Sequence, residues 1–254
     1  MDNYLSENTI DNIDKILSFI DEHSFNFFLN FKLDCHYKTN NNERVIKVFF
    51  IHKLILLELV EIVDKVIDKF IEKADQENDE NKSEEDPKSK LLALLSLKDD
   101  GGNTPIHYAA FKGNLKIIIK LIDIGVNYKE RNNAGLNLIH MASQGDFPNI
   151  LIYFREKYNI DLFEEVDNSN NNALHWACAS GSKNSLDFLL FYINETYNNL
   201  DVINRTDGQG QTVLHITILT TGSTSTVKKL IKKGVDINIK DNNNVSAVDL
   251  VKNN

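Results

Sequence analysis

The sequence predicts an all-α solenoid, in which pairs of short helices repeat along the chain and stack into one continuous core. A histidine-containing motif recurs in the segments TPIHYAA, LNLIHMA, NALHWAC and TVLHITI. Its histidines, His107, His140, His175 and His215, are 33, 35 and 40 residues apart. An apolar segment with helical spacing follows each motif. Such a period indicates one helical hairpin per repeat, and each hairpin must stack on its neighbours to bury its apolar face.

A period near 33 residues with a Thr-Pro-Leu-His-x-Ala signature is typical of ankyrin repeats, and residues 91–254 resemble that family. The resemblance implies a β-turn and two antiparallel helices in each repeat. We expect four full repeats and a C-terminal cap that begins at Asp241, in which Asp249 takes the place of the histidine. The second repeat is predicted to be one residue short between His140 and Gly145, and the third to carry an insertion at residues 192–201.

The recurring polar residues are explained by this scaffold. An acidic residue or asparagine lies eight residues before each histidine, at Asp99, Asn132, Asp167 and Asp207. Five residues before it stands a residue that tolerates a left-handed turn: Gly102, Gly135, Asn170 and Gly210. The histidines themselves are expected to be neutral and to bond the backbone of adjacent turns. The alternative, metal ligands or catalytic bases, is disfavoured because neighbouring repeats lie about 10 Å apart. We therefore predict no metal, cofactor or catalytic residue.

The remaining chain divides into two parts. Residues 1–73 are predicted to be helical, with a polar break at KTNNNE, residues 38–43. The apolar stretch 45–71 is expected to form a helix that docks either on the first repeat or on another subunit. Residues 74–90 contain DQENDENKSEEDPKSK, which is predicted to be a flexible acidic linker, with an acidic docking segment as the alternative.

Composition limits the functional classes. The formal net charge of −9 argues against a nucleic-acid partner. The two cysteines, Cys35 and Cys178, indicate neither a disulfide framework nor a zinc site, so a reducing, cytoplasmic location is expected. Charged residues interrupt the most apolar stretch, residues 45–63, and membrane insertion is not expected. We also find no phosphate loop, paired-carboxylate motif or nucleophile elbow, and predict that this chain is not an enzyme.

A narrower resemblance concerns residues 140–162 (HMASQGDFPNILIYFREKYNIDL) and 172–182 (NALHWACASGS). They look like the ankyrin region of protozoan DHHC-type protein S-acyltransferases. The chain contains neither the Asp-His-His-Cys motif nor the cysteine cluster of those enzymes, so no catalytic role transfers. The resemblance implies that Trp176 matches a tryptophan that contacts substrate peptides. The companion asparagine would fall near Gln144 or Gly145, where this chain differs.

The function predicted from the sequence is protein binding, by an adaptor or by a subunit of a large multi-subunit complex. The alternative is a substrate-recruiting region of, or derived from, a DHHC-type S-acyltransferase. The binding surface is expected on the concave face and the turn tips: Trp176, Phe111, Ser180, Asn133, Ser169 and Gln209. For Trp176 itself, packing between repeats as part of the core is the alternative to a place on the binding surface. Cys178 is expected to be a buried, inert thiol.

Overall fold

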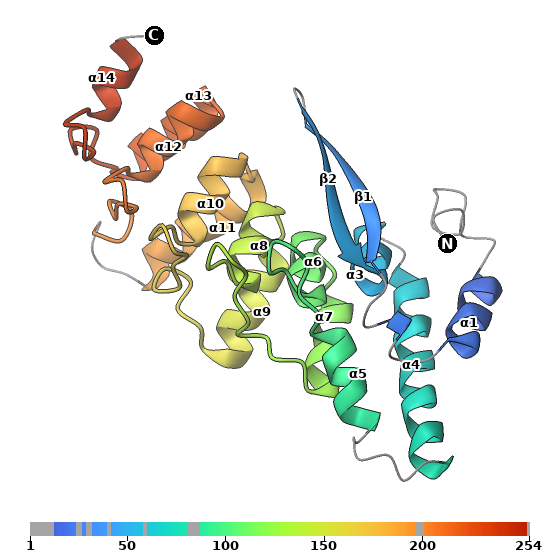
Figure 1. The fold of residues 1–254 in the computed structure, drawn as a ribbon. Helices are drawn as coiled ribbons and strands as arrows, with labels where there is room; N and C mark the ends of the chain where they lie inside the picture. Colours follow the sequence, from blue (N-terminus) through green and yellow to red (C-terminus); the bar gives the residue numbers. More distant parts are fainter. Residues whose placement is uncertain are drawn as a thin grey trace. The chain divides into compact units, whose positions relative to one another are not determined.

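The computed structural model describes residues 13–23, 27–28, 32–39, 42–57, 60–80, 87–196 and 201–252. The chain forms two compact units, Met1–Asn133 and Ala134–Asn254. Figure 1 shows the order of helices and strands along each of them.

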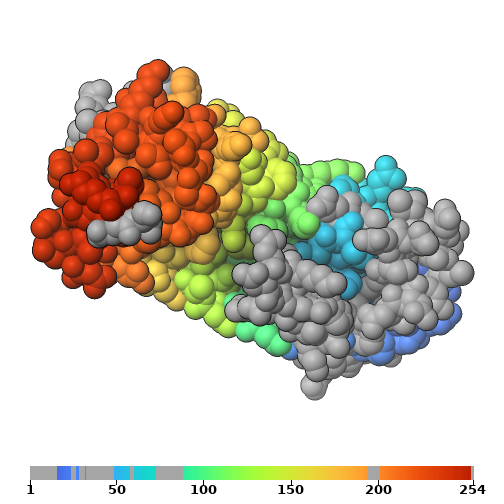
Figure 2. Space-filling view, turned by 90° about the horizontal axis from the view of Figure 1, so that it is seen from above, coloured from blue at the N-terminus to red at the C-terminus, as the bar shows by residue number. Residues whose placement is uncertain are grey.

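The second unit contains three helical hairpins and the start of a fourth. They are α8 (Leu138–Gln144) with α9 (Pro148–Tyr158), α10 (Ala173–Ser180) with α11 (Lys183–Thr196), α12 (Val213–Thr220) with α13 (Thr224–Lys232), and α14 (Ala247–Lys252). The first helices α8, α10, α12 and α14 pack side by side in chain order. Figure 2 shows the C-terminal end of this stack, where α12 to α14 are drawn in orange and red. Together with the hairpin α6–α7 of the first unit, this confirms four repeats and a cap.

The first unit carries the first predicted repeat, α6 (Pro105–Phe111) and α7 (Leu115–Ile124), and a further helix pair before it. This pair is α3 (Phe50–Leu56) and α4 (Val60–Glu80), and α3 packs on α6 while α4 packs on α7. His52 is the third residue of α3, as His107 is of α6, and its Nδ1 accepts the N–H of Phe49 at 3.2 Å. The pair α3–α4 therefore repeats the geometry of a repeat hairpin. The sequence left two docking places for the apolar stretch 45–71, the first repeat or another subunit. In the structure, the helices α3 and α4 of this stretch dock on the first repeat.

The expectation of a wholly helical region 1–73 is wrong in one segment. An antiparallel hairpin, β1 (Lys32–Thr39) and β2 (Asn42–Phe49), precedes α3, with Lys32 opposite Phe49 and Thr39 opposite Asn42. The β-branched residues of NERVIKVF suit a strand. Before the hairpin, the structure describes helix α1 (Ile13–Glu22) and two further helical residues, Phe27 and Phe28.

Helices also extend into the segment predicted as a linker. α4 continues to Glu80, and α5 (Pro87–Leu95) begins before residue 90. Residues 81–86 lie outside the described residues, so the linker at 74–90 stays a prediction. The ring of Phe28, which follows α1, contacts three helices: its centroid lies 5.8 Å from that of Phe19 on α1, 5.6 Å from that of Phe50 on α3 and 5.1 Å from that of Phe70 on α4.

Two details of the expected repeats need correction. The second repeat is not short, because the left-handed residue six positions after His140 is Asp146 (φ 70°), which matches Gly113 and Gly181 in the neighbouring repeats. In the apolar segment that follows the fourth motif, Leu230 is buried, but its neighbour Ile231 is 49% exposed. The predicted insertion after residue 192 partly lengthens α11, which has 14 residues against 10 in α7. Residues 197–200 lie outside the described residues.

Candidate interaction surface

The first, third and fourth repeats and the C-terminal cap each begin with a turn whose backbone is hydrogen-bonded to an aspartate, whereas the second repeat has Asn132 at this position. Oδ1 of Asp167 accepts the backbone N–H groups of Ser169 and Asn171, both at 2.8 Å. Asp99, Asp207 and Asp241 make the same pair of bonds two and four residues ahead. A carboxylate that accepts two backbone N–H groups fixes the turn and leaves the residues between them at its exposed tip.

Backbone hydrogen bonds join successive turn tips within the second unit. The N–H of Asn168 bonds to the carbonyl of Ala134 at 3.0 Å, that of Gly208 to Ser169 at 2.7 Å, and that of Asn242 to Gln209 at 2.9 Å. Within the first unit, the N–H of Asn133 bonds to Gly101 at 3.0 Å. The tips thus form a ladder of fixed spacing, which is a rigid platform for side chains.

Glycine is required where the turns approach one another. Gly135 has a φ of 81°, and a Cβ at this position would collide with the backbone N and the side chain of Asn168. Gly102 has the same relation to Asn133 in the first unit. The positive φ and the lack of space act together, so these glycines belong to the scaffold.

The repeat histidines also belong to the scaffold. Nδ1 of His140 accepts the N–H of Asn137 at 3.1 Å, and its Nε2 lies 3.1 Å from the carbonyl of Glu165 in the following turn. His215 spans in the same way to Val245. Burial lowers the pKa of His175 to about 4, which keeps this imidazole neutral. Among the described residues, no three His, Cys, Asp or Glu side chains are grouped as a metal site would need.

Cys178 does not have the environment of a nucleophile. Its side chain is fully buried on α10, and burial raises the pKa of the thiol to about 12. A thiol with so high a pKa carries almost no thiolate at neutral pH.

Trp176 is neither fully buried in the core nor fully exposed. It is half-buried on α10, and its Nε1 donates to Oδ2 of Asp167 at 3.0 Å. Tyr108 of the first unit, at the corresponding position, donates its hydroxyl to Asp99 in the same way. The indole therefore braces its own turn, and the rest of the ring stays partly open to solvent.

The structure places the other predicted site residues in two groups. In the second unit, Ser169 and Gln209 are exposed at turn tips and Ser180 is exposed at the end of α10. In the first unit, Asn133 is an exposed tip residue whose Nδ2 donates to the carbonyl of Asp100, and Phe111 is half-buried at the end of α6. Four of the six predicted residues therefore lie on the turns and first helices of the second unit: Trp176, Ser180, Ser169 and Gln209.

One residue of this surface was missed by the sequence reasoning. Leu219, near the end of α12, is 52% exposed. It stands four residues after His215, as Phe111 stands four residues after His107, so the repeat register contained the signal. Because α10 and α12 pack side by side, Leu219 adds an apolar side chain to the surface that carries Trp176 and Ser180.

The comparisons with known proteins agree with the fold. The family described as "Ankyrin repeats (3 copies)" matches residues 118–201 and 138–241, and "Ankyrin repeat" matches residues 101–133. The B-cell lymphoma 3 protein of Homo sapiens is 27% identical over 161 residues, which are 62% of this chain and 34% of that protein. Palmitoyltransferase AKR1 of Lachancea kluyveri is 29% identical over 138 residues, 52% of this chain and 17% of that protein.

The chain thus spans only about a third or less of these relatives. A solved complex of the Bd0816 predatory endopeptidase from Bdellovibrio bacteriovorus with the immunity protein Bd3460 gives a TM-score of 0.54 at 22% identity, covering 80% of this chain and 90% of that chain, which is a likeness of fold. In the described part of the chain, no helix has the length and apolarity needed to cross a bilayer. The recurring turns, helix pairs and family matches together show that this chain belongs to the ankyrin-repeat family.

Proposed function

We propose that this protein is an adaptor or a subunit of a larger assembly, and that it binds a partner protein through the first helices and turn tips of its repeats. The observation that carries the proposal is the surface of the second unit, where the half-buried Trp176 and the exposed Leu219 lie on adjacent helices. Aromatic side chains at such places are enriched among the residues that dominate binding energy.

The surroundings of this pair support a peptide-like partner. The tip residues Ser169 and Gln209 are neutral hydrogen-bonding groups on a braced ladder, so they can bond to a partner backbone with little loss of their own freedom. An apolar centre with a polar rim is the usual composition of a protein interface.

Site-specific photo-crosslinking in the source cells tests this proposal. A photoreactive phenylalanine analogue at Leu219 is expected to capture a defined partner, and the same residue at Val251, 62% exposed on α14, serves as the matched control. Capture should be lost when Trp176→Tyr is added, because the tyrosine removes the outer part of the indole. Equal capture from both positions, or only links within the chain, would contradict the proposal.

A second candidate function is the recruitment of substrates for protein S-acylation. It is favoured by the match to a protein named as a palmitoyltransferase and by the Leu-His-Trp-Ala-Cys run that includes Trp176. The test is to ask whether the captured partner carries a thioester-linked acyl chain, using hydroxylamine-sensitive labelling. If the captured partner carries no acyl chain, the S-acylation role is contradicted, whereas the proposed adaptor function is unaffected.

A further inference from the structure

A shallow hollow lies between two second helices of the second unit, apart from the turn tips. It has a volume of about 660 Å³ and is formed by side chains of α11 and α13. The lining residues are Asp187, Leu190, Phe191, Lys229, Lys232 and Lys233. None of them belongs to the surface of Trp176 and Leu219.

The charge of this hollow is opposite to that of the protein as a whole. Three lysines and one aspartate line it, in a chain whose formal net charge is −9. Asp187 pairs with Lys229, with Nζ 2.5 Å from Oδ1 and 2.8 Å from Oδ2. Lys232 and Lys233 form no ion pair with any residue in the described ranges. Their charge is therefore available to an acidic partner.

Apolar side chains beside the lysines add a second requirement. Phe191 is 60% exposed on α11, and it lines the hollow together with the buried Leu190. A large aromatic side chain exposed in a concave basic site lowers the free energy of binding when a partner covers it. The hollow thus suits a chain that carries an apolar side chain among carboxylates. A partner with a flat charged surface could not place an apolar side chain inside the hollow.

We propose that the α11–α13 hollow is a second docking site, which binds an acidic protein segment with an apolar anchor residue. The anchor contacts Phe191 and Leu190, and carboxylates of the segment pair with Lys232 and Lys233. Asp187 competes with the segment for Lys229. The site is independent of the concave surface, so the protein can hold two partners at once.

A synthetic probe tests the proposal on the full chain. The probe is a fluorescent peptide with a central Leu-Phe pair flanked by glutamates, and binding is followed by fluorescence anisotropy at low salt. The double variant Lys232→Glu with Lys233→Glu should weaken binding about tenfold or more, since two attractive pairs become repulsive. The matched control, Lys240→Glu with Lys252→Glu, makes the same charge change at exposed positions outside the hollow and should have little effect.

Two further variants separate this site from a general attraction between charges. Phe191→Ser should weaken binding of the probe but not of a peptide in which Leu-Phe is replaced by Ser-Ser. Asp187→Asn should tighten binding about threefold, because Lys229 is released from its intramolecular partner. Thermal unfolding of each variant checks that the fold is retained.

Four outcomes would overturn the proposal. The first is probe binding that both lysine double variants lower equally, and the second is weaker binding by Asp187→Asn. The third is binding to phosphatidylserine vesicles in the absence of binding to the probe, which would assign the hollow to a membrane surface. The fourth is loss of probe binding in Trp176→Tyr, which would place the acidic segment on the surface of Trp176 and Leu219.

Discussion

The indole Nε1 of Trp176 donates a hydrogen bond to Oδ2 of Asp167 across 3.0 Å, while Oδ1 of the same carboxylate holds Ser169 and Asn171. The aromatic residue of the proposed binding surface is therefore part of the support for its own turn tip. Removal of the whole side chain would alter binding and stability together. A tyrosine, which stands at the corresponding position of the first repeat as Tyr108, is the better probe of binding.

The carboxylate of Asp167 is predicted to contribute more to stability than that of the next turn. Asp167→Asn should lower the free energy of unfolding by about 1–3 kcal/mol, because it places an amide among four donors at a buried site: the N–H groups of Ser169 and Asn171, Nδ2 of Asn171 and Nε1 of Trp176. Asp207→Asn is the matched control, since Asp207 holds its turn in the same way but the corresponding first-helix residue is Ile216, which has no donor. Urea unfolding followed by Trp176 fluorescence measures both, and equal losses would contradict a role for the indole bond.

Asp146 is predicted to be replaceable by asparagine but not by alanine. Its φ of 70° suits Asp, Asn or Gly, and its Oδ1 accepts the N–H of Ser185 at 2.8 Å near the start of α11. Asp146→Asn should change the free energy of unfolding by less than about 0.5 kcal/mol. Asp146→Ala should cost about 1–2 kcal/mol, because it loses the bond and strains the backbone. An alanine variant as stable as the asparagine variant in thermal unfolding would refute this interpretation.

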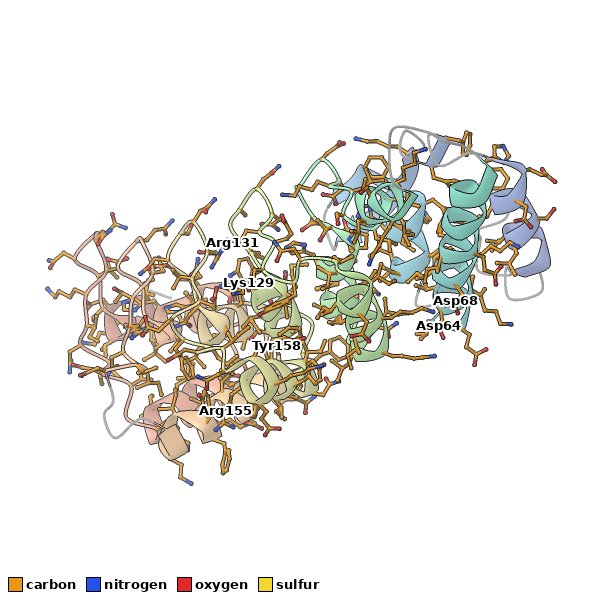
Figure 3. All side chains as sticks on the ribbon, turned by 90° about the horizontal axis from the view of Figure 1, so that it is seen from below. Asp64, Asp68, Lys129, Arg131, Arg155 and Tyr158 are labelled. Carbon is orange, nitrogen blue, oxygen red and sulfur yellow. The ribbon has the colours of Figure 1, made fainter. Side chains whose placement is uncertain are left out.

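The ion pairs of Asp64 are predicted to stabilise the α4–α7 contact in a pH-dependent way. Asp64 lies 2.6 Å from Nζ of Lys116 and 2.5 Å from Nζ of Lys120, which also reaches Asp68 on the same side of α4 (Figure 3). Hydrogen bonds from these lysines hold the pKa of Asp64 below its ordinary value of 3.8. Its contribution is therefore present above pH 3.8 and is lost as the pH falls through the lowered pKa.

The test compares wild type with Asp64→Asn in urea at neutral pH and near pH 3. We expect a loss of about 0.5 kcal/mol at neutral pH, a value already reduced for solvent screening, and a smaller loss near pH 3. Asp123→Asn, an exposed carboxylate on α7, should match wild type at both pH values. A loss that stays the same in acid would show that the ion pairs are not its cause.

The repeat array could be predicted from the sequence because its information is local and periodic. Gly102, Gly135 and Gly210 adopt the left-handed turns expected of them, and His140 and His215 bond adjacent turns as expected. Each of these residues is required by a contact that recurs with the period of the repeat. The period therefore predicts the fold even where a single residue differs. Asn170, for example, adopts a left-handed φ of 62° at a position where the other repeats have glycine.

The errors arose where one residue departs from the repeat. Asp146 takes the left-handed position that glycine occupies in neighbouring repeats. Gly145 was instead aligned with those glycines, so the second repeat was wrongly predicted to be one residue short. The unit at α3–α4 was not recognised because His52 lies 55 residues before His107 and a long α4 and an extra α5 separate them. The hairpin β1–β2 was missed since its apolar residues also fit a helical period. The proposed binding surface was predicted in part, but the exposure of Leu219 depends on three-dimensional packing that the sequence analysis did not consider.

The last prediction concerns acid sensitivity caused by His175. Burial lowers its pKa to about 4 from an ordinary value of 6.5, so between these values the unfolded chain binds more protons than the folded one. The free energy of unfolding should therefore fall as the pH drops from 6.5 towards 4, by up to about 1.4 kcal/mol per pH unit for this one group. Trp176 is the only tryptophan and is adjacent in sequence, so its fluorescence in urea reports on the same unit. His175→Gln should make the dependence on pH less steep, whatever its stability at pH 7, whereas Ser180→Ala should keep the full slope. An unchanged slope in His175→Gln would mean that other groups carry the acid sensitivity of the second unit.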